Sequence, residues 1–204
     1  MPRGRPLEFD RSKALELAMR EFWKRGYAST SMADLTEAMG INRPSLYAAF
    51  GCKEALFREA AEFYVASEGV EAVAALEEGA TAREAIERLL LFFAKNYVEK
   101  GKPPGCMMVL SSLVGAPEDE EIRDFLAAAR HEGISNVKKR LDRGVKDGDV
   151  PKKTDTAALA AYISTVTQGM SVQARDGVKR SDLERIVRQQ MAVWDGLIAA
   201  SQKA

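Results

Sequence analysis

The sequence has 204 residues, which at roughly 100 to 200 residues per domain corresponds to one sizeable domain or two small ones. Hydrophobic residues make up 46% and charged residues 29%, a balance that excludes a disordered or fibrous chain. Basic and acidic residues both number 30, yet residues 1–58 hold ten Lys or Arg against seven Asp or Glu. A surface for a polyanion is therefore expected to be local and N-terminal.

The cysteine content and the lengths of the apolar runs indicate the cellular compartment and exclude several kinds of metal site. Cys52 and Cys106 are the only cysteines, and they form neither a disulfide framework nor a zinc-type Cys/His cluster. No apolar run approaches the about 20 residues that span a bilayer, and none follows the basic N-terminus as a secretory signal would. We expect a soluble cytoplasmic protein without membrane association, metal or cofactor.

Apolar residues recur with helical spacing almost throughout, and the first three helices are short. Each begins at a capping residue and ends at a glycine, which predicts helices over 10–26, 31–40 and 42–51. Later segments predict helices over 52–78, 81–101, 107–114, 118–146, 155–176 and 181–201. The fold class is therefore all-α with about nine helices. We expect an N-terminal three-helix domain over 1–51 and a larger helical domain over 52–204.

The second and third helices are joined only by Gly40-Ile41-Asn42. Two helices with such a turn form a helix-turn-helix unit, whose second helix enters the DNA major groove. In that helix Leu46 and Phe50 lie four residues apart and are expected to face the core. The residues left near the outside are Arg43, Ser45, Tyr47 and Ala48.

These outward side chains suit DNA. Arg43 can donate two hydrogen bonds to guanine, Ser45 can pair with several bases, and Tyr47 can reach a phosphate oxygen. The alternative is a helical hairpin that merely packs and solvates its polar face.

The run from Thr30 to Phe57 resembles the DNA-binding segment of the TetR family of bacterial transcriptional regulators. The resemblance rests on the glycine before the short helix, on Leu46-Tyr47 and Phe50, and on Lys53-Glu54-Ala55-Leu56, and it covers roughly residues 8–60. It implies an all-α homodimer that binds a double-stranded DNA operator and carries a C-terminal domain for a small-molecule effector. The sequence is therefore interpreted as a ligand-responsive regulator, a repressor released from a palindromic operator, and not as an enzyme.

Carried over by position, the resemblance assigns phosphate contacts to Thr30, Ser31, Tyr47 and Lys53, and base contacts to Arg43 and Ser45 around Pro44. One departure is Cys52, where the family usually has a better capping residue such as Ser. Arg3 and Arg5 lie in an N-terminal arm that either reaches the minor groove or is a frayed, solvated tail.

The effector is expected among the middle helices. The candidates for its pocket are aromatic, adaptable or thiol side chains, although most of them could equally be plain core: Phe93, Tyr97, Cys106, Met107, Phe125 and Tyr162. Cys106 follows Pro-Pro-Gly at a helix start, where unpaired N–H groups favour a thiolate. One hypothesis makes this cysteine a sensor of reactive small molecules, and the other makes it a small buried hydrophobe.

The last two helices have more apolar surface than one core needs. We expect a dimer interface from the stripe Leu183, Ile186, Val187, Trp194, Leu197 and Ile198, beside a small-residue face of Ala160, Ser164, Thr167 and Ser171. The alternative is that these faces pack within the monomer's own core.

Two rivals of other classes remain open at this point. The first is an all-α enzyme that uses the central pocket, and the second is a dimeric interaction protein that binds no DNA. His131 is the only histidine and lies in a charged stretch, which removes most acid–base and metal arrangements.

Overall fold

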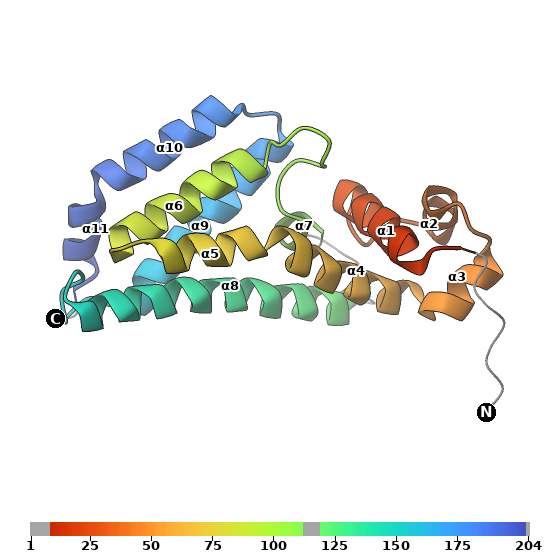
Figure 1. Ribbon diagram of the computed structural model, residues 1–204, viewed down its shortest axis with the longest axis horizontal. Helices are drawn as coiled ribbons and strands as arrows, with labels where there is room; N and C mark the ends of the chain where they lie inside the picture. Colours follow the sequence, from red (N-terminus) through yellow and green to blue (C-terminus); the bar gives the residue numbers. More distant parts are fainter. Residues whose placement is uncertain (1–8, 112–118, 203–204) are drawn as a thin grey trace.

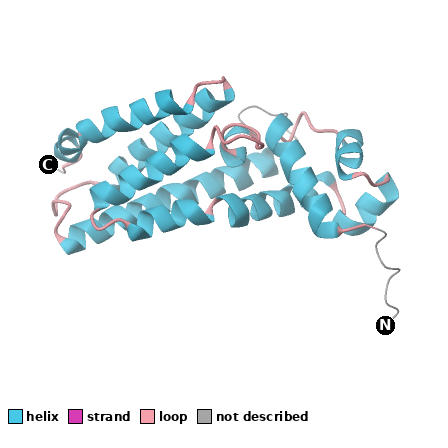
Figure 2. Cartoon of the chain, turned by 45° about the horizontal axis from the view of Figure 1, so that its top comes forward, coloured by secondary structure: helices cyan, strands magenta, loops and turns pink. Residues whose placement is uncertain are grey.

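The computed structural model describes residues 9–111 and 119–202, and the regular elements in these ranges are all helices (Figures 1 and 2). The eleven helices are α1 (Arg11–Arg25), α2 (Met32–Met39), α3 (Arg43–Phe50), α4 (Lys53–Glu68), α5 (Val70–Glu78), α6 (Ala82–Asn96), α7 (Met107–Leu110), α8 (Glu120–Asp147), α9 (Thr156–Arg175), α10 (Arg180–Ala192) and α11 (Trp194–Ala200). The predicted all-α fold is confirmed. Arg3 and Arg5 lie outside the described residues.

The helix count differs from the expected nine because two predicted helices are each divided. The segment 52–78 bends at Gly69, so that α4 packs on α1 while α5 packs on α6 and α8 (Figure 1). Glycine is a weak helix former, which makes it a low-cost place for such a bend. The segment 181–201 turns at Val193, and this turn lets Trp194 bury itself in the same core as α10.

The first three helices begin as their capping residues predict. The Asp10 carboxylate accepts from the backbone N–H groups of Ser12 and Lys13. Asn42 Oδ1 accepts from Ser45 N at 2.9 Å, which fixes the start of α3. Cys52 caps α4 through a long contact, with Ala55 N 3.4 Å from its sulfur. These local interactions set the helix starts before any tertiary packing is considered.

Two hydrophobic clusters hold the chain together. The N-terminal core joins α1–α4 with residues of α7 and with the first turns of α8, among them Ile122 and Leu126. The C-terminal core joins α5, α6 and α9–α11 with the later part of α8, among them Val137 and Leu141. Figure 1 shows α8 running beneath both α4 and α5. The helix α8 and the partly buried Cys106, which packs against both clusters, therefore connect the two cores.

Candidate nucleic-acid interface and ligand cavity

The turn between α2 and α3 is held by backbone geometry. Gly40 has a φ of 66°, the left-handed conformation that glycine adopts without cost, and its N–H donates to the last carbonyls of α2. No atom would meet a Cβ at this position within 4 Å, so the requirement for glycine is conformational and not steric. Ile41 N also donates to Thr36 O at 3.1 Å. The three-residue turn thus fixes the orientation of α3 relative to α2.

The helix α3 buries one side and exposes the other. Leu46 is fully buried and Phe50 is 5% exposed, both in the N-terminal core. Arg43 and Pro44 are exposed, Ser45 is half-buried, and Tyr47 is 50% exposed. The predicted division of this helix into a core face and an outward face is confirmed. Its N-terminal turn presents a guanidinium and a hydroxyl at the surface, the groups that read base edges.

The start of α2 places its two predicted phosphate ligands differently. Ser31 is exposed and forms a reciprocal capping box with Asp34, whose side chain accepts from Ser31 N and Oγ. These hydrogen bonds hold the pKa of the Asp34 carboxyl below its usual value. Thr30 is only 1% exposed, and its hydroxyl donates to Gly26 O at 2.6 Å. Thr30 therefore stabilises the turn between α1 and α2, whereas Ser31 lies at the surface.

Lys53, in the first turn of α4, is partly withdrawn from solvent. Its Nζ lies 4.3 Å from the centroid of the Tyr27 ring, a cation–π contact. Burial lowers the pKa of this ammonium, and the charge of Asp119 partly opposes that shift. The contact holds the ammonium beside the Tyr27 ring, and Lys53 itself begins α4, where unpaired N–H groups attract anions.

A ligand cavity of about 220 Å³ lies between α4, α5, α6, α8 and α9, with a mostly apolar lining. Of the predicted residues, Phe93, Tyr97 and Cys106 line it. Met107 is buried in the N-terminal core, and its neighbour Met108 reaches the cavity instead. Sequence reasoning missed the polar lining, which includes Asn96, Asn136, Ser164, Thr167 and Gln168.

Two predicted effector residues lie elsewhere. Phe125 packs against the N-terminal core, 6.5 Å from the ring of Phe57 and beneath the Arg58 guanidinium. Tyr162 is 42% exposed on the outer side of α9. Neither side chain lines the cavity, because periodicity identifies apolar positions but not the hollow that they face.

The expected small-residue dimer face lies inside the chain. Ala160, Ser164, Thr167 and Ser171 are all buried, and Ser164 and Thr167 line the cavity. Of the apolar stripe, Leu183, Val187, Trp194 and Ile198 are buried in the C-terminal core, while Ile186 and Leu197 pack against it. Both faces therefore pack within the core of the single chain, which is the alternative that the sequence left open. Small side chains on α9 make room for the cavity and for the approach of neighbouring helices.

Cys106 meets the cavity as a buried thiol. Burial raises the pKa of this thiol, and hydrogen bonds from Tyr64 and from the N–H groups of Val109 and Met108 oppose the shift without cancelling it. Cys106 N donates to Ser171 Oγ at 2.8 Å. The expected activation of a thiolate by the helix start is therefore outweighed by desolvation.

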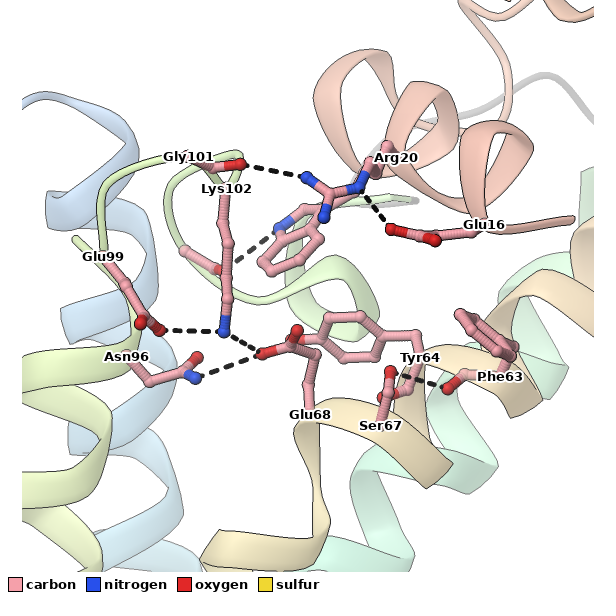
Figure 3. A network of polar contacts seen from close by, with 12 residues as sticks. Glu16, Arg20, Phe63, Tyr64, Ser67, Glu68, Asn96, Glu99, Gly101 and Lys102 are labelled. Carbon is pink, nitrogen blue, oxygen red and sulfur yellow. Dashed lines mark hydrogen bonds and ion pairs between the residues drawn. The ribbon is translucent and has the colours of Figure 1, made fainter. Parts of the chain in front are cut away.

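The 97–106 loop lies between α6 and α7 and contacts α1 (Figure 3), and two of its residues, Tyr97 and Cys106, line the cavity. Trp23 Nε1 donates to Gly105 O at 3.1 Å, and Arg20 Nη1 donates to Gly101 O at 2.9 Å. Lys102 Nζ lies 2.8 Å from carboxylate oxygens of both Glu68 and Glu99. The loop therefore bonds to α1 and to the end of α4.

Residues 9–111 and 119–202 hold no group of three or more His, Cys, Asp or Glu side chains that could bind a metal ion. Among the helices in these ranges, none is both long and apolar enough to cross a membrane.

The family model "Bacterial regulatory proteins, tetR family" matches residues 14–60, which contain α2, the Gly40 turn and α3. The HTH-type transcriptional repressor ComR of Escherichia coli is 32% identical over 197 residues, which cover 96% of this chain and 94% of ComR. The chain belongs to the TetR family. It is a DNA-binding transcriptional regulator, as the sequence predicted.

Other relatives in the TetR family agree. The repressor BdcR of Escherichia coli is 30% identical, with 85% of this chain and 83% of BdcR covered. A solved structure of the TetR family regulator CifR, a cysteine mutant complexed with 26-bp double-strand operator DNA, superposes with a TM-score of 0.91 at 45% identity. That match covers 93% of this chain and 100% of CifR. TetR-family regulators act as dimers on double-stranded DNA and respond to small molecules.

Proposed function

We propose that the chain is a repressor whose two copies hold a palindromic operator through α3 and leave it when a small molecule fills the ligand cavity. The observation that carries this proposal is the 97–106 loop, because it ends at the cavity-lining Cys106 and is bonded to α1 of the DNA-binding unit. The similarity to the repressors ComR and BdcR, and to CifR in complex with operator DNA, supports it.

In this proposal the exposed turn of α3 reads the bases. Arg43 and Ser45 face base edges beside Pro44, while Ser31, Tyr47 and Lys53 bind phosphates. The buried Thr30 acts indirectly, because its hydroxyl holds the turn that presents Ser31.

The dimer face that we propose lies on the outer side of α9 and on α10–α11. Tyr162 and Val172 of α9 and Val193 are exposed apolar side chains there, with the exposed Thr165 and Gly169 between the two α9 residues. Small residues between larger ones let two helices approach closely, which suits a four-helix interface across a two-fold axis. Such a dimer would present its two α3 helices about one DNA turn apart.

Release requires that the ligand bind the two dimer conformations with different affinity, since equal binding shifts nothing. A ligand seated between α4, α6 and α9 would favour the conformation in which the 97–106 loop has moved α1 and, with it, the α3 spacing. The cavity binds its ligand in this proposal and does not transform it, so the chain is a regulator without enzymatic activity. It acts where bacterial DNA lies, in the cytoplasm.

The test begins with selection of duplexes from a random pool, followed by fluorescence anisotropy with the selected duplex. Operator affinity should fall steeply with salt, because phosphate contacts release counterions. Octanol at saturating concentration should weaken the complex, and Ala72→Phe, which fills the cavity, should remove that response. An enzyme or a DNA-independent interaction protein would select no duplex, and this outcome would refute the proposal.

A further inference from the structure

A second hollow, of about 250 Å³, lies between α5 and α8 beside the ligand cavity. Its α8 wall is Asn136, Lys139, Arg140 and Arg143, which are spaced so that they share one helix face. Its α5 wall includes Val73 and Leu76. Val73, Leu76 and Asn136 also line the ligand cavity, so the two hollows share a wall. Figure 1 shows α5 lying along α8 at this place.

The second hollow is cationic. Three of its seven lining residues are Lys139, Arg140 and Arg143, and one, Glu77, carries a carboxylate. Arg143 is partly engaged, since its Nη2 donates to Glu77 O at 3.3 Å and its Nε lies 3.9 Å from Asp147. The cationic side chains of this hollow still outnumber its one carboxylate, so the hollow favours an anion.

Arg140 is the unusual residue of this wall. It is only 5% exposed, and its Nη2 donates to Gly79 O at 3.1 Å. Its Nε and Nη1 are buried and find no hydrogen-bond partner among the residues that the structure describes. Burial, followed by the charge of Arg143, lowers the pKa of this guanidinium, and the charges of Asp149 and Asp147 oppose that shift without cancelling it. Buried guanidinium donors are costly when unpaired, and an anionic oxygen is the acceptor that satisfies them best.

We infer that the ligand of this protein is a small amphipathic organic anion, whose apolar body occupies the ligand cavity and whose head group lies in the second hollow against Arg140. The inference rests on the proposed function, because it names the ligand class of the same cavity. The apolar lining beside Phe93 and Leu89 accepts a hydrocarbon chain. Val73 and Leu76 line both hollows, so one molecule of modest length that passes beside these two side chains would reach both. A carboxylate and a phosphate monoester offer the same anionic oxygens to Arg140.

The experiment compares octanoate, octyl phosphate and neutral octanol by isothermal titration calorimetry with the full-length protein. The anions should bind about tenfold or more tightly than octanol, because a charge-assisted hydrogen bond to a buried donor contributes more than a neutral one. Octanoate binding against octyl phosphate binding distinguishes the two kinds of head group. Equal affinity of the anions and octanol would overturn the inference while leaving the ligand cavity in place.

Substitutions distinguish a contact between the head group and Arg140 from a general attraction of anions to the cationic face of α8. Arg140→Met should reduce octanoate affinity to that of octanol, and Arg140→Lys should restore part of the difference. If Arg140→Met fails to fold, the double variant Lys139→Ala/Arg143→Ala tests the same hollow, because both side chains line it and are more exposed than Arg140. This variant should also reduce the preference for octanoate over octanol. The matched control is Lys146→Ala, an exposed cation on α8 outside the hollow, which should leave the preference unchanged.

Operator release is measured separately by anisotropy, so the two proposals can fail independently. Octanoate that binds with the Arg140-dependent preference but leaves the operator complex intact would overturn the proposed release and keep the inference. Octanoate that does not bind a protein with full operator affinity would overturn the inference.

Discussion

The indole Nε1 of Trp23 donates a hydrogen bond to the carbonyl oxygen of Gly105 at 3.1 Å, which joins the last turn of α1 to the residue before Cys106. The bond is buried, and the Trp23 ring also packs edge-to-face on Tyr64, with ring centroids 4.8 Å apart. Both Tyr64 and Cys106 line the ligand cavity. The hydrogen bond and the ring contact therefore join the cavity wall to α1 of the DNA-binding unit.

Trp23→Phe tests this link. The substitution keeps an aromatic ring in the N-terminal core but removes the donor to the buried Gly105 carbonyl, so the free energy of unfolding should fall by about 1–3 kcal/mol beyond the loss of packing. The measurement is urea denaturation followed by circular dichroism, together with hydrogen exchange of the 97–106 loop. Trp194→Phe is the control, because it makes the same change of ring in the C-terminal core away from this loop. Identical stability loss and loop exchange in both variants would contradict the link.

Arg43→Ala should relax sequence preference. The guanidinium is exposed at the start of α3, where a bidentate contact with guanine contributes about 1–3 kcal/mol of discrimination. Anisotropy with the selected operator and with single-base variants measures the loss, which should fall on one or two positions of each half-site. Lys146→Ala, an exposed change near the end of α8, should leave operator affinity unchanged. Uniform weakening on every duplex would show that Arg43 contacts the backbone and not a base.

Lys53→Ala should act on all duplexes alike. A phosphate contact carries no sequence information, so its loss should weaken binding uniformly and reduce the slope of log K against log salt by about 1. The cation–π contact with Tyr27 orients Lys53, and Lys53→Arg should therefore retain much of the affinity. The measurement is a salt titration of operator and non-specific DNA. A change of sequence preference in place of the salt slope would reverse the roles given to Lys53 and Arg43.

Local signals predicted the DNA-binding unit well because its geometry is local. The cap at Asn42, the left-handed Gly40 and the four-residue spacing of Leu46 and Phe50 decide where α3 begins, turns and packs without reference to the rest of the chain. The orientation of α9 could not be predicted in this way. Periodicity shows that Ser164 and Thr167 share a face, but whether that face meets the cavity or a second subunit depends on residues far away in the sequence.

The bend at Gly69 shows the same limit. A glycine inside an apolar helical pattern predicts only a weak point, and here the packing of α4 in the N-terminal core and of α5 in the C-terminal core turns that weak point into a change of direction. The second hollow arises between α5 and α8 after this bend. In the sequence Arg140 is one of many charged residues of a long helix, and no local pattern predicts that it is buried.

Ser31→Ala should destabilise the start of α2 in a pH-dependent manner. The lost cap lowers the free energy of unfolding by about 1 kcal/mol near neutral pH. Hydrogen bonds from Ser31 lower the pKa of Asp34 in the folded state, so the stability that they provide is complete above the unfolded pKa of about 3.9 and is lost as pH falls through the folded value. The difference between wild type and Ser31→Ala should therefore shrink in acid, as measured by urea denaturation across pH. A difference that grows as pH falls would contradict the capping box.

The reactivity of the Cys106 thiol distinguishes the two hypotheses for this residue, a reactive sensor and a small buried hydrophobe. Because burial raises the pKa of its thiol, only a small fraction is thiolate at neutral pH, and iodoacetamide should modify the exposed Cys52 first. Mass spectrometry of digested protein after timed labelling measures both rates, and modification of Cys106 should accelerate as pH rises toward the raised pKa. Cys52→Ser removes the competing site and serves as the control. Preferential labelling of Cys106 at neutral pH, together with loss of operator binding that Cys106→Ser prevents, would establish it as a reactive sensor in place of a small buried hydrophobe.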